Sequence, residues 1–240
     1  MSVLEVRGLN VHHGQLLALR DFSLAVGEGE TVAVIGANGA GKSTLLSALA
    51  GLIKPTTGTM ALDGRDVTQL PAYRRIAAGI ALVPEGRRLF KSLTVEENLL
   101  TGTYRARKGP WSVQRVMELF DWMPDRRAQN ASQLSGGEQQ AVAIGRALVG
   151  NPRLLLIDEL SLGLAPIIIQ KIYRVLPQII AEGTSVLIVE QDVSQALRIA
   201  DSVKCLLEGH TVLGGKPGEF TMQQIENAYF GIDHTTLAGA

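Results

Sequence analysis

Apolar and polar positions alternate along the first 34 residues, a pattern that predicts short strands joined by turns. The apolar positions include Leu4, Val6, Leu17, Leu19, Phe22, Leu24, Val26, Val32 and Val34. Glycines interrupt them at Gly8, Gly14, Gly27 and Gly29. Residues 31–35 then form an unbroken apolar run, which predicts a buried strand.

Further apolar runs, each four or five residues long, predict more buried strands. They span residues 80–83, 154–157 and 185–189, and each is followed directly by Pro or by charged residues. Segments with helical character lie around them, at residues 45–53, 71–79 and 193–200. A hairpin is expected from Met60 through Gly64, and another across Glu208-Gly209-His210.

The pattern changes to helical between residues 93 and 150, so we expect a helical insertion into the α/β body. Thr94 with Glu97, and Ser135 with Glu138, have the spacing of capping boxes at helix starts. Pro166 fits the first position of a later helix, and Pro177 is expected to kink or end it.

Residues 36–44 read G-x-x-x-x-G-K-S-T and lie between the predicted strand at 31–35 and the predicted helix after it, the context of a phosphate-binding loop. Glycines allow successive backbone N–H groups to face a phosphate, and the helix start directs its positive dipole end there. Lys42 would neutralise β- and γ-phosphate oxygens, and the Ser43 hydroxyl would hold Mg²⁺. The alternative is a Gly-rich turn without a ligand. The predicted nucleotide-binding residues are Gly36, Ala37, Asn38, Gly39, Ala40, Gly41, Lys42, Ser43 and Thr44.

Asp158 and Glu159 end the apolar run at 154–157, where ligands bind in open α/β sheets. Asp158 would order Mg²⁺ and Glu159 would act as general base toward the attacking water.

Composition narrows the class of protein. Lys plus Arg and Asp plus Glu both number 23, so no excess positive charge favours nucleic acid as a partner. The single Cys205 lies in an apolar run and is expected to be a core side chain. The amino-terminal residues lack the blocks of a signal peptide, and no apolar run reaches about 18 residues. Any membrane association is therefore expected to go through a partner.

The order of the phosphate-binding loop, the segment Leu134-Ser135-Gly136-Gly137-Glu138 and the Asp158-Glu159 pair resembles the ATP-binding cassette of ABC transporters over roughly residues 3–230. The resemblance implies a P-loop NTPase core with a RecA-like parallel sheet, an N-terminal antiparallel β subdomain and a helical insertion subdomain at about 87–150. It implies one ABC ATPase domain over residues 1–230 and a loose tail at 231–240. It also implies a head-to-tail dimer, in which Ser135, Gly136, Gly137 and Glu138 bind ATP held by the partner.

Three segments are similar to those of one subclass, the ATPases of branched-chain amino-acid importers: residues 83–88, 161–166 and 189–191. They differ from the wider family, which has Gln where Glu85 stands and a switch His where Gln191 stands. Both positions are expected to act in catalysis, with Glu85 also reaching Mg²⁺. His13 aligns with an aromatic residue that stacks on adenine. Leu160 stands where Pro is common.

The expected function is thus an Mg²⁺-dependent ATPase that drives uptake of branched-chain amino acids through transmembrane permease subunits, served by a solute-binding protein. The resemblance places it at the cytoplasmic face of the inner membrane, paired with an identical or different ATPase subunit, and residues 87–104 are the candidate permease contact. Urea, amides or another amino acid are alternative solutes. Two other classes remain open, an ABC-type ATPase acting on ribosomes or DNA and a phosphate-loop kinase for a small metabolite.

Overall fold

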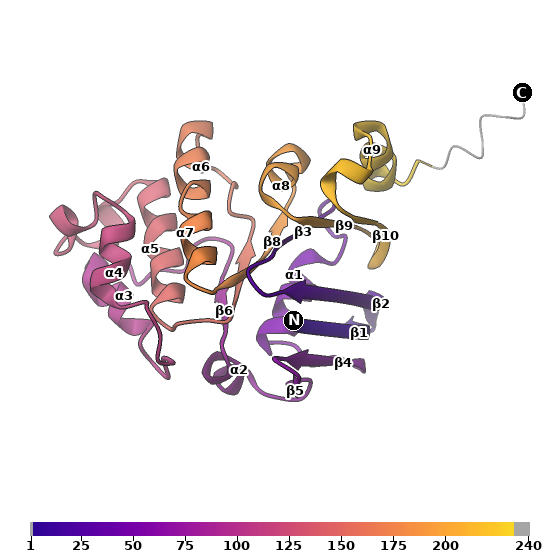
Figure 1. Cartoon of the computed structure of the whole chain (residues 1–240), viewed down its shortest axis with the longest axis horizontal. Coiled ribbons are helices and arrows are strands. Elements are labelled where there is room, and N and C mark those ends of the chain that lie inside the picture. Colours follow the sequence, from indigo (N-terminus) through magenta and orange to yellow (C-terminus); the bar gives the residue numbers. More distant parts are fainter. Residues whose placement is uncertain (1, 233–240) are drawn as a thin grey trace, which may run out of the picture.

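The computed structural model describes residues 2–232, which form two β-sheets and a set of helices (Figure 1). The strands are β1 (Ser2–His13), β2 (Leu16–Gly27), β3 (Thr31–Ile35), β4 (Thr57–Leu62), β5 (Arg65–Asp66), β6 (Ile80–Val83), β7 (Leu154–Asp158), β8 (Ser185–Glu190), β9 (Ser202–Leu207) and β10 (His210–Gly215). The α-helices are α1 (Lys42–Ala50), α2 (Ala72–Ala78), α3 (Val95–Thr101), α4 (Val113–Leu119), α5 (Gly136–Leu148), α6 (Pro166–Tyr173), α7 (Leu176–Ala181), α8 (Val193–Ile199) and α9 (Met222–Phe230). Short 3₁₀ turns are η1 (Pro124–Arg126), η2 (Ala131–Gln133) and η3 (Pro217–Glu219).

The larger sheet has the order β10-β9-β3-β8-β7-β6, and all of its neighbours are parallel except β10 with β9. The central strands β3, β7 and β8 are mostly apolar and are buried throughout, because both faces of the sheet are covered there. In β3, for example, Val32 and Val34 join the core that packs with α1, whereas Ala33 and Ile35 join the core on the other face. The expected α/β fold with a parallel sheet is confirmed.

The smaller sheet has the order β2-β1-β4-β5 and is antiparallel. The prediction of short strands was wrong here, because β1 and β2 each run for 12 residues. Gly8 does not end a strand. Its positive φ of 58° accompanies a shift in the pairing between Val6 and Leu9, which is the signature of a β-bulge.

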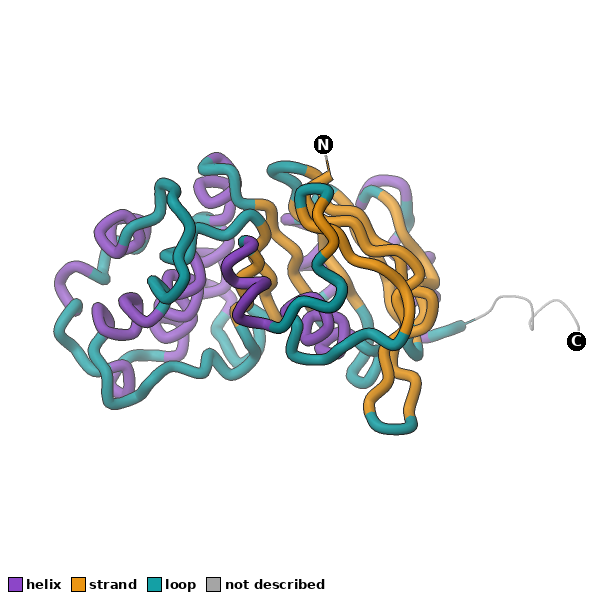
Figure 2. Tube along the Cα trace, turned by 90° about the horizontal axis from the view of Figure 1, so that it is seen from below, coloured by secondary structure: helices purple, strands orange, loops and turns teal. Residues whose placement is uncertain are grey.

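Between β6 and β7 the chain forms helices and turns, with one isolated β-bridge between Thr94 and Asn130, and Figure 2 shows these helices gathered at one end of the molecule, away from most strands. Both predicted capping boxes are present, at Thr94 with Glu97 and at Ser135 with Glu138. The helix that begins at Pro166 ends before Pro177, which lies in the first turn of α7.

The C-terminal part contains both an expected and an unexpected element. The hairpin across Glu208-Gly209-His210 joins β9 and β10 as predicted. The sequence prediction missed α9, which packs on β9 through Ile225. The tail predicted at 231–240 lies, after Ile232, outside the described residues. Within residues 2–232, no helix is long and apolar enough to cross a bilayer.

Candidate nucleotide site

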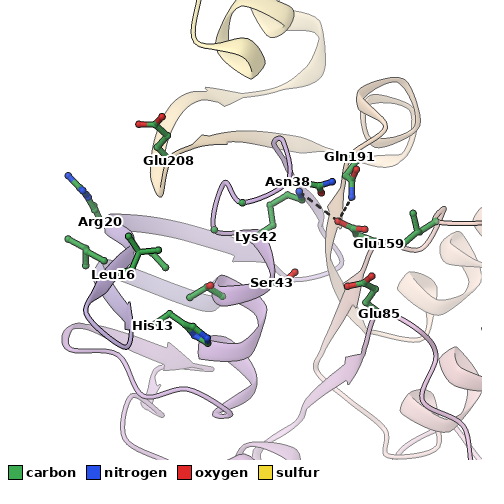
Figure 3. A pocket seen from close by; sticks show the side chains of 16 residues that line it. His13, Leu16, Arg20, Asn38, Lys42, Ser43, Glu85, Glu159, Gln191 and Glu208 are labelled. Atoms are coloured by element: carbon green, nitrogen blue, oxygen red, sulfur yellow. Dashed lines mark hydrogen bonds and ion pairs between the residues drawn. The ribbon is translucent and has the colours of Figure 1, made fainter.

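A cavity of about 740 Å³ opens at the carboxyl ends of the parallel strands. Most of its polar lining comes from the loop after β3, from Glu85 after β6, from Glu159 after β7 and from Gln191 after β8. Figure 3 shows Lys42 and Ser43 on one side of this cavity and Glu159, Gln191 and Glu85 on the other. Parallel pairing brings these strand ends to one edge of the sheet, where open α/β sheets bind ligands.

The loop at residues 36–44 turns the chain from β3 into α1, which packs between the two sheets. Gly41 precedes α1 with φ 106°, and an added Cβ would lie 2.6 Å from the carbonyl oxygen of Ala18. Only glycine fits both the conformation and the space. Lys42, Ser43 and Thr44 line the cavity, so the start of α1 lies at it, which is the position of a helix that follows a phosphate-binding loop.

Lys42 is buried, and its Nζ donates to the carbonyl oxygens of Gly36 at 2.8 Å and Ala37 at 3.0 Å. The same Nζ lies 3.8 Å from Oε1 of Glu159. Burial lowers the pKa of Lys42, and the carboxylates of Glu159 and Asp158 oppose that shift. A desolvated cation thus lies between the loop and the two carboxylates that end β7.

Glu159 begins the turn after β7, and its backbone has a positive φ of 45°. Its N–H donates to the carbonyl oxygen of Val189 at 3.0 Å, and its Oε1 accepts from Nε2 of Gln191 at 2.6 Å. This Oε1 therefore lies between the amide of Gln191 and the ammonium of Lys42 (Figure 3). Such a carboxylate is held in one orientation at the rim of the cavity.

Asp158 is buried beside Glu159, and its Oδ1 has no hydrogen-bond partner among the described residues. Burial raises the pKa of Asp158 to about 6, and the carboxylates of Glu159 and Glu85 add to this effect, whereas Lys42 and the Ser43 hydroxyl oppose it. An unpaired carboxylate oxygen near a serine hydroxyl is a suitable donor set for a hydrated Mg²⁺. No cluster of three or more His, Cys, Asp or Glu side chains that could hold a metal occurs within residues 2–232.

We expect Asp158→Asn to stabilise the protein in the absence of nucleotide and Mg²⁺. The folded-state pKa of about 6 lies above the ordinary value of 3.8, so ionised Asp158 costs stability above pH 6 and the cost vanishes as the pH falls toward 4. At about 1.4 kcal/mol per pKa unit, the variant gains roughly 2–3 kcal/mol at pH 7.5. Urea denaturation at pH 7.5 and 4.5 measures this difference, with the exposed Asp125→Asn as the control. A gain that is equal at both pH values would contradict the argument.

Ser135, Gly136, Gly137 and Glu138, the residues predicted to act in trans, are not among the residues that line this cavity. Ser135 and Glu138 cap α5 reciprocally, and Glu138 also pairs with Arg126 at 2.7 Å. Ser135, Gly137 and Glu138 line a separate cavity of about 590 Å³ beside α6. A Cβ on Gly137 would clash with the side chain of Ile168, so this glycine also has a packing role. Within one chain, the structure does not bring the predicted trans residues together with Lys42.

His13, the last residue of β1, lines the nucleotide cavity together with Leu16 and Arg20 of β2 (Figure 3). Leu16, Arg20 and Glu208 also line the cavity, and the sequence pattern did not indicate them. The backbone N–H of Arg20 donates to the carbonyl oxygen of Gly209 at 2.9 Å, which joins β2 to the β9–β10 turn. No local sequence pattern indicated these three residues, and in the structure Leu16 is 70% exposed beside the cavity.

Comparison with known proteins places the chain among transport ATPases. Residues 19–161 match the family model described as ABC transporter. The chain is 45% identical over 226 residues to the high-affinity branched-chain amino acid transport ATP-binding protein BraG of Pseudomonas aeruginosa, covering 93% of this chain and 97% of that protein. It is 35% identical to the probable branched-chain amino acid transport ATP-binding protein LivF of Archaeoglobus fulgidus, covering 88% and 91%. It is also 31% identical to the lipopolysaccharide export system ATP-binding protein LptB of Haemophilus influenzae, covering 96% and 98%.

Solved structures agree with the fold. A nucleotide-free ATP-binding cassette from an ABC transporter superposes with a TM-score of 0.82 at 26% identity, over 95% of each chain. A dimeric post-hydrolysis state of the cassette MJ0796, bound to ADP and Pi, superposes with a TM-score of 0.78 at 27% identity, over 89% of this chain and 98% of that one. The family model, the relatives and the shared fold together show that this chain belongs to the ABC transporter family, as one of its ATP-binding cassettes.

Proposed function

We propose that this cassette hydrolyses ATP to drive the import of branched-chain amino acids. The observation that carries the proposal is the convergence of Lys42, Glu159 and Gln191 on one cavity at the carboxyl ends of β3, β7 and β8. A buried cation can stabilise the charge of the transferred phosphoryl group, and an oriented carboxylate with an amide donor can position the attacking water.

The residues of the chain divide the chemistry between them. The backbone N–H groups of residues 36–44 and the start of α1 bind the phosphates, and Lys42 neutralises their charge. Glu159 accepts the proton of the attacking water, and Gln191 holds Oε1 of Glu159 through its amide. His13 stacks on the adenine. Ser43, Asp158 and Glu85 would hold Mg²⁺, which supplies charge neutralisation at the β- and γ-phosphate oxygens when bound.

The second half of each site is supplied by a partner. Ser135, Gly136, Gly137 and Glu138 lie away from Lys42 within one chain, so they would contact a nucleotide held by another cassette. The dimeric cassette bound to ADP and Pi supports such an arrangement. The two cassettes can be identical copies or two related chains.

The membrane partner is a pair of permease subunits, to which the cassette binds at the cytoplasmic face of the inner membrane, and a solute-binding protein delivers the solute. Exposed apolar side chains at Phe90, Leu100 and Tyr104 support the segment 87–104 as the permease contact. The similarity to BraG and LivF favours branched-chain amino acids over urea, amides or other amino acids. The similarity to LptB shows that this fold also serves export, so the permease has to be identified directly.

Incubation of the purified chain with MgATP alone tests the proposal. We expect ADP and phosphate to form without an added acceptor, at a rate that rises with protein concentration because two copies complete each site. A requirement for a small-molecule acceptor would instead indicate a kinase. Co-purification with detergent-solubilised permease subunits, followed by identification of the solute-binding protein, would test the solute.

A further inference from the structure

Glu190 is a buried carboxylate next to the nucleotide cavity. It ends β8 and is 0% exposed. Its Oε1 accepts from the backbone N–H of Ser161 at 3.1 Å and from the Tyr173 hydroxyl at 3.1 Å, and its Oε2 accepts from the Ser161 hydroxyl at 2.7 Å. The partners are therefore a turn after β7 and a side chain of α6, and all of them are neutral groups.

A carboxylate in this position is costly for the fold. Burial raises the pKa of Glu190, and the hydrogen bonds from Ser161, Tyr173 and the Gln191 backbone oppose the shift. Satisfying both oxygens offsets the cost of desolvation only in part. An apolar side chain at the end of β8 would be buried without this desolvation cost. The strand itself therefore does not require a carboxylate here, and the hydrogen bonds of Glu190 need another explanation.

These hydrogen bonds join the two segments that carry the reacting groups. Ser161 is two residues beyond Glu159, and Glu190 directly precedes Gln191. Glu159 has a left-handed backbone, a conformation that non-glycine residues keep only when surrounding contacts enforce it. The Ser161 N–H and hydroxyl, both held by Glu190, are contacts of this kind immediately after Glu159.

We propose that Glu190 is a positioning residue for ATP hydrolysis. By binding Ser161 and Tyr173 it fixes the turn after β7 against the end of β8, and so keeps Oε1 of Glu159 on the amide of Gln191. This inference rests on the proposed ATPase function and adds to it a residue that does not touch the nucleotide cavity.

The charge of Glu190 offers a rival explanation, since it also acts on Lys42 electrostatically. The variant Glu190→Gln distinguishes positioning through hydrogen bonds from this electrostatic effect on Lys42. Its amide oxygen can accept from the Ser161 N–H and the Tyr173 hydroxyl, and its NH₂ can donate to the Ser161 hydroxyl oxygen. Glu190→Gln thus keeps the connections and removes the charge, whereas Glu190→Ala removes both.

Steady-state ATP hydrolysis by the full-length chain tests the proposal. We expect Glu190→Ala to lower kcat at least 30-fold with KM for ATP within threefold, and Glu190→Gln to stay within fivefold of the wild type. The double variant Glu190→Ala, Gln191→Ala should have a kcat less than threefold below that of the slower single variant, because both residues act on the carboxylate of Glu159.

Glu30 offers a matched control for general loss of stability. Its carboxylate also accepts hydrogen bonds from the backbone N–H of Gly27 and from the Ser202 hydroxyl, the latter at 2.7 Å. Glu30 directly precedes β3, however, so it lies at the amino ends of the parallel strands, and the nucleotide cavity lies at their carboxyl ends. Truncation to Ala leaves the N–H and hydroxyl donors of either glutamate without an acceptor, so Glu30→Ala is expected to lower the thermal midpoint as Glu190→Ala does, with kcat unchanged.

Hydrogen exchange separates this proposal from the ATPase assignment. In nucleotide-free protein, the amides of residues 159–163 should exchange at least tenfold faster in Glu190→Ala than in the wild type, and no faster in Glu190→Gln. If wild-type protein hydrolyses no ATP, the ATPase proposal fails, but the exchange data still test whether Glu190 fixes the turn at residues 159–163. Unchanged exchange in Glu190→Ala, or equal kcat losses in Glu190→Gln and Glu190→Ala, would overturn the role assigned to Glu190.

Discussion

Lys42→Ala is expected to lose ATP hydrolysis by a factor of about 10³. Lys42 is the buried cation of the cavity, held by the carbonyl oxygens of Gly36 and Ala37 and lying 3.8 Å from Glu159. Its removal leaves the negative charges of Glu159 and Asp158 uncompensated beside the place where the triphosphate would bind. Losing one preorganised donor from an active site costs about 10²–10³ in rate, and here a full charge is lost with it.

The loss should appear in both nucleotide affinity and turnover, because Lys42 acts on the ground state as well as on the transition state. Phosphate release and binding of a fluorescent ATP analogue measure the two effects separately. Lys54→Ala is the matched control, since Lys54 is exposed shortly after α1 ends. Hydrolysis by Lys42→Ala within threefold of the wild type would remove Lys42 from the role proposed here.

The parts of the fold and site that could be predicted are those encoded by neighbouring residues. The loop at 36–44 follows a strand and opens a helix, and Asp158 and Glu159 follow an apolar run, so local pattern alone brought them to attention. Parallel pairing of β3 with β8 and of β8 with β7 then does the rest, because it aligns the ends of these strands at one edge.

What could not be predicted depends on contacts between distant segments. Leu16, Arg20 and Glu208 reach the cavity because the smaller sheet packs over the β9–β10 turn, an arrangement without a local signature. The length of β1 could not be predicted because Gly8 indicated a turn, whereas in the structure it lies in a β-bulge within the strand. Glu190 was visible as a polar residue closing an apolar run, but its link to Ser161 appears only when β7 and β8 lie side by side.

Glu159→Gln is expected to bind ATP as tightly as the wild type while hydrolysing it about 10³-fold more slowly. The amide has the same shape, and its oxygen can still accept from Nε2 of Gln191, so the cavity keeps its geometry. It cannot take a proton from the attacking water, and a general base contributes about 10²–10⁴ in rate. It also removes a negative charge beside the γ-phosphate, which favours retention of ATP.

Slow turnover with intact binding should allow the nucleotide-bound dimer to accumulate. Size-exclusion chromatography with light scattering, in MgATP, should find Glu159→Gln mostly as a dimer, and with ADP mostly as a monomer. Glu118→Gln is the matched control, because Glu118 is exposed on α4 and does not line the nucleotide cavity, and its turnover should match the wild type. Hydrolysis at the wild-type rate in Glu159→Gln would exclude Glu159 as the base. A slow variant that stays monomeric with ATP enclosed would instead exclude the shared site, since Ser135, Gly136 and Gly137 would then have no nucleotide to contact.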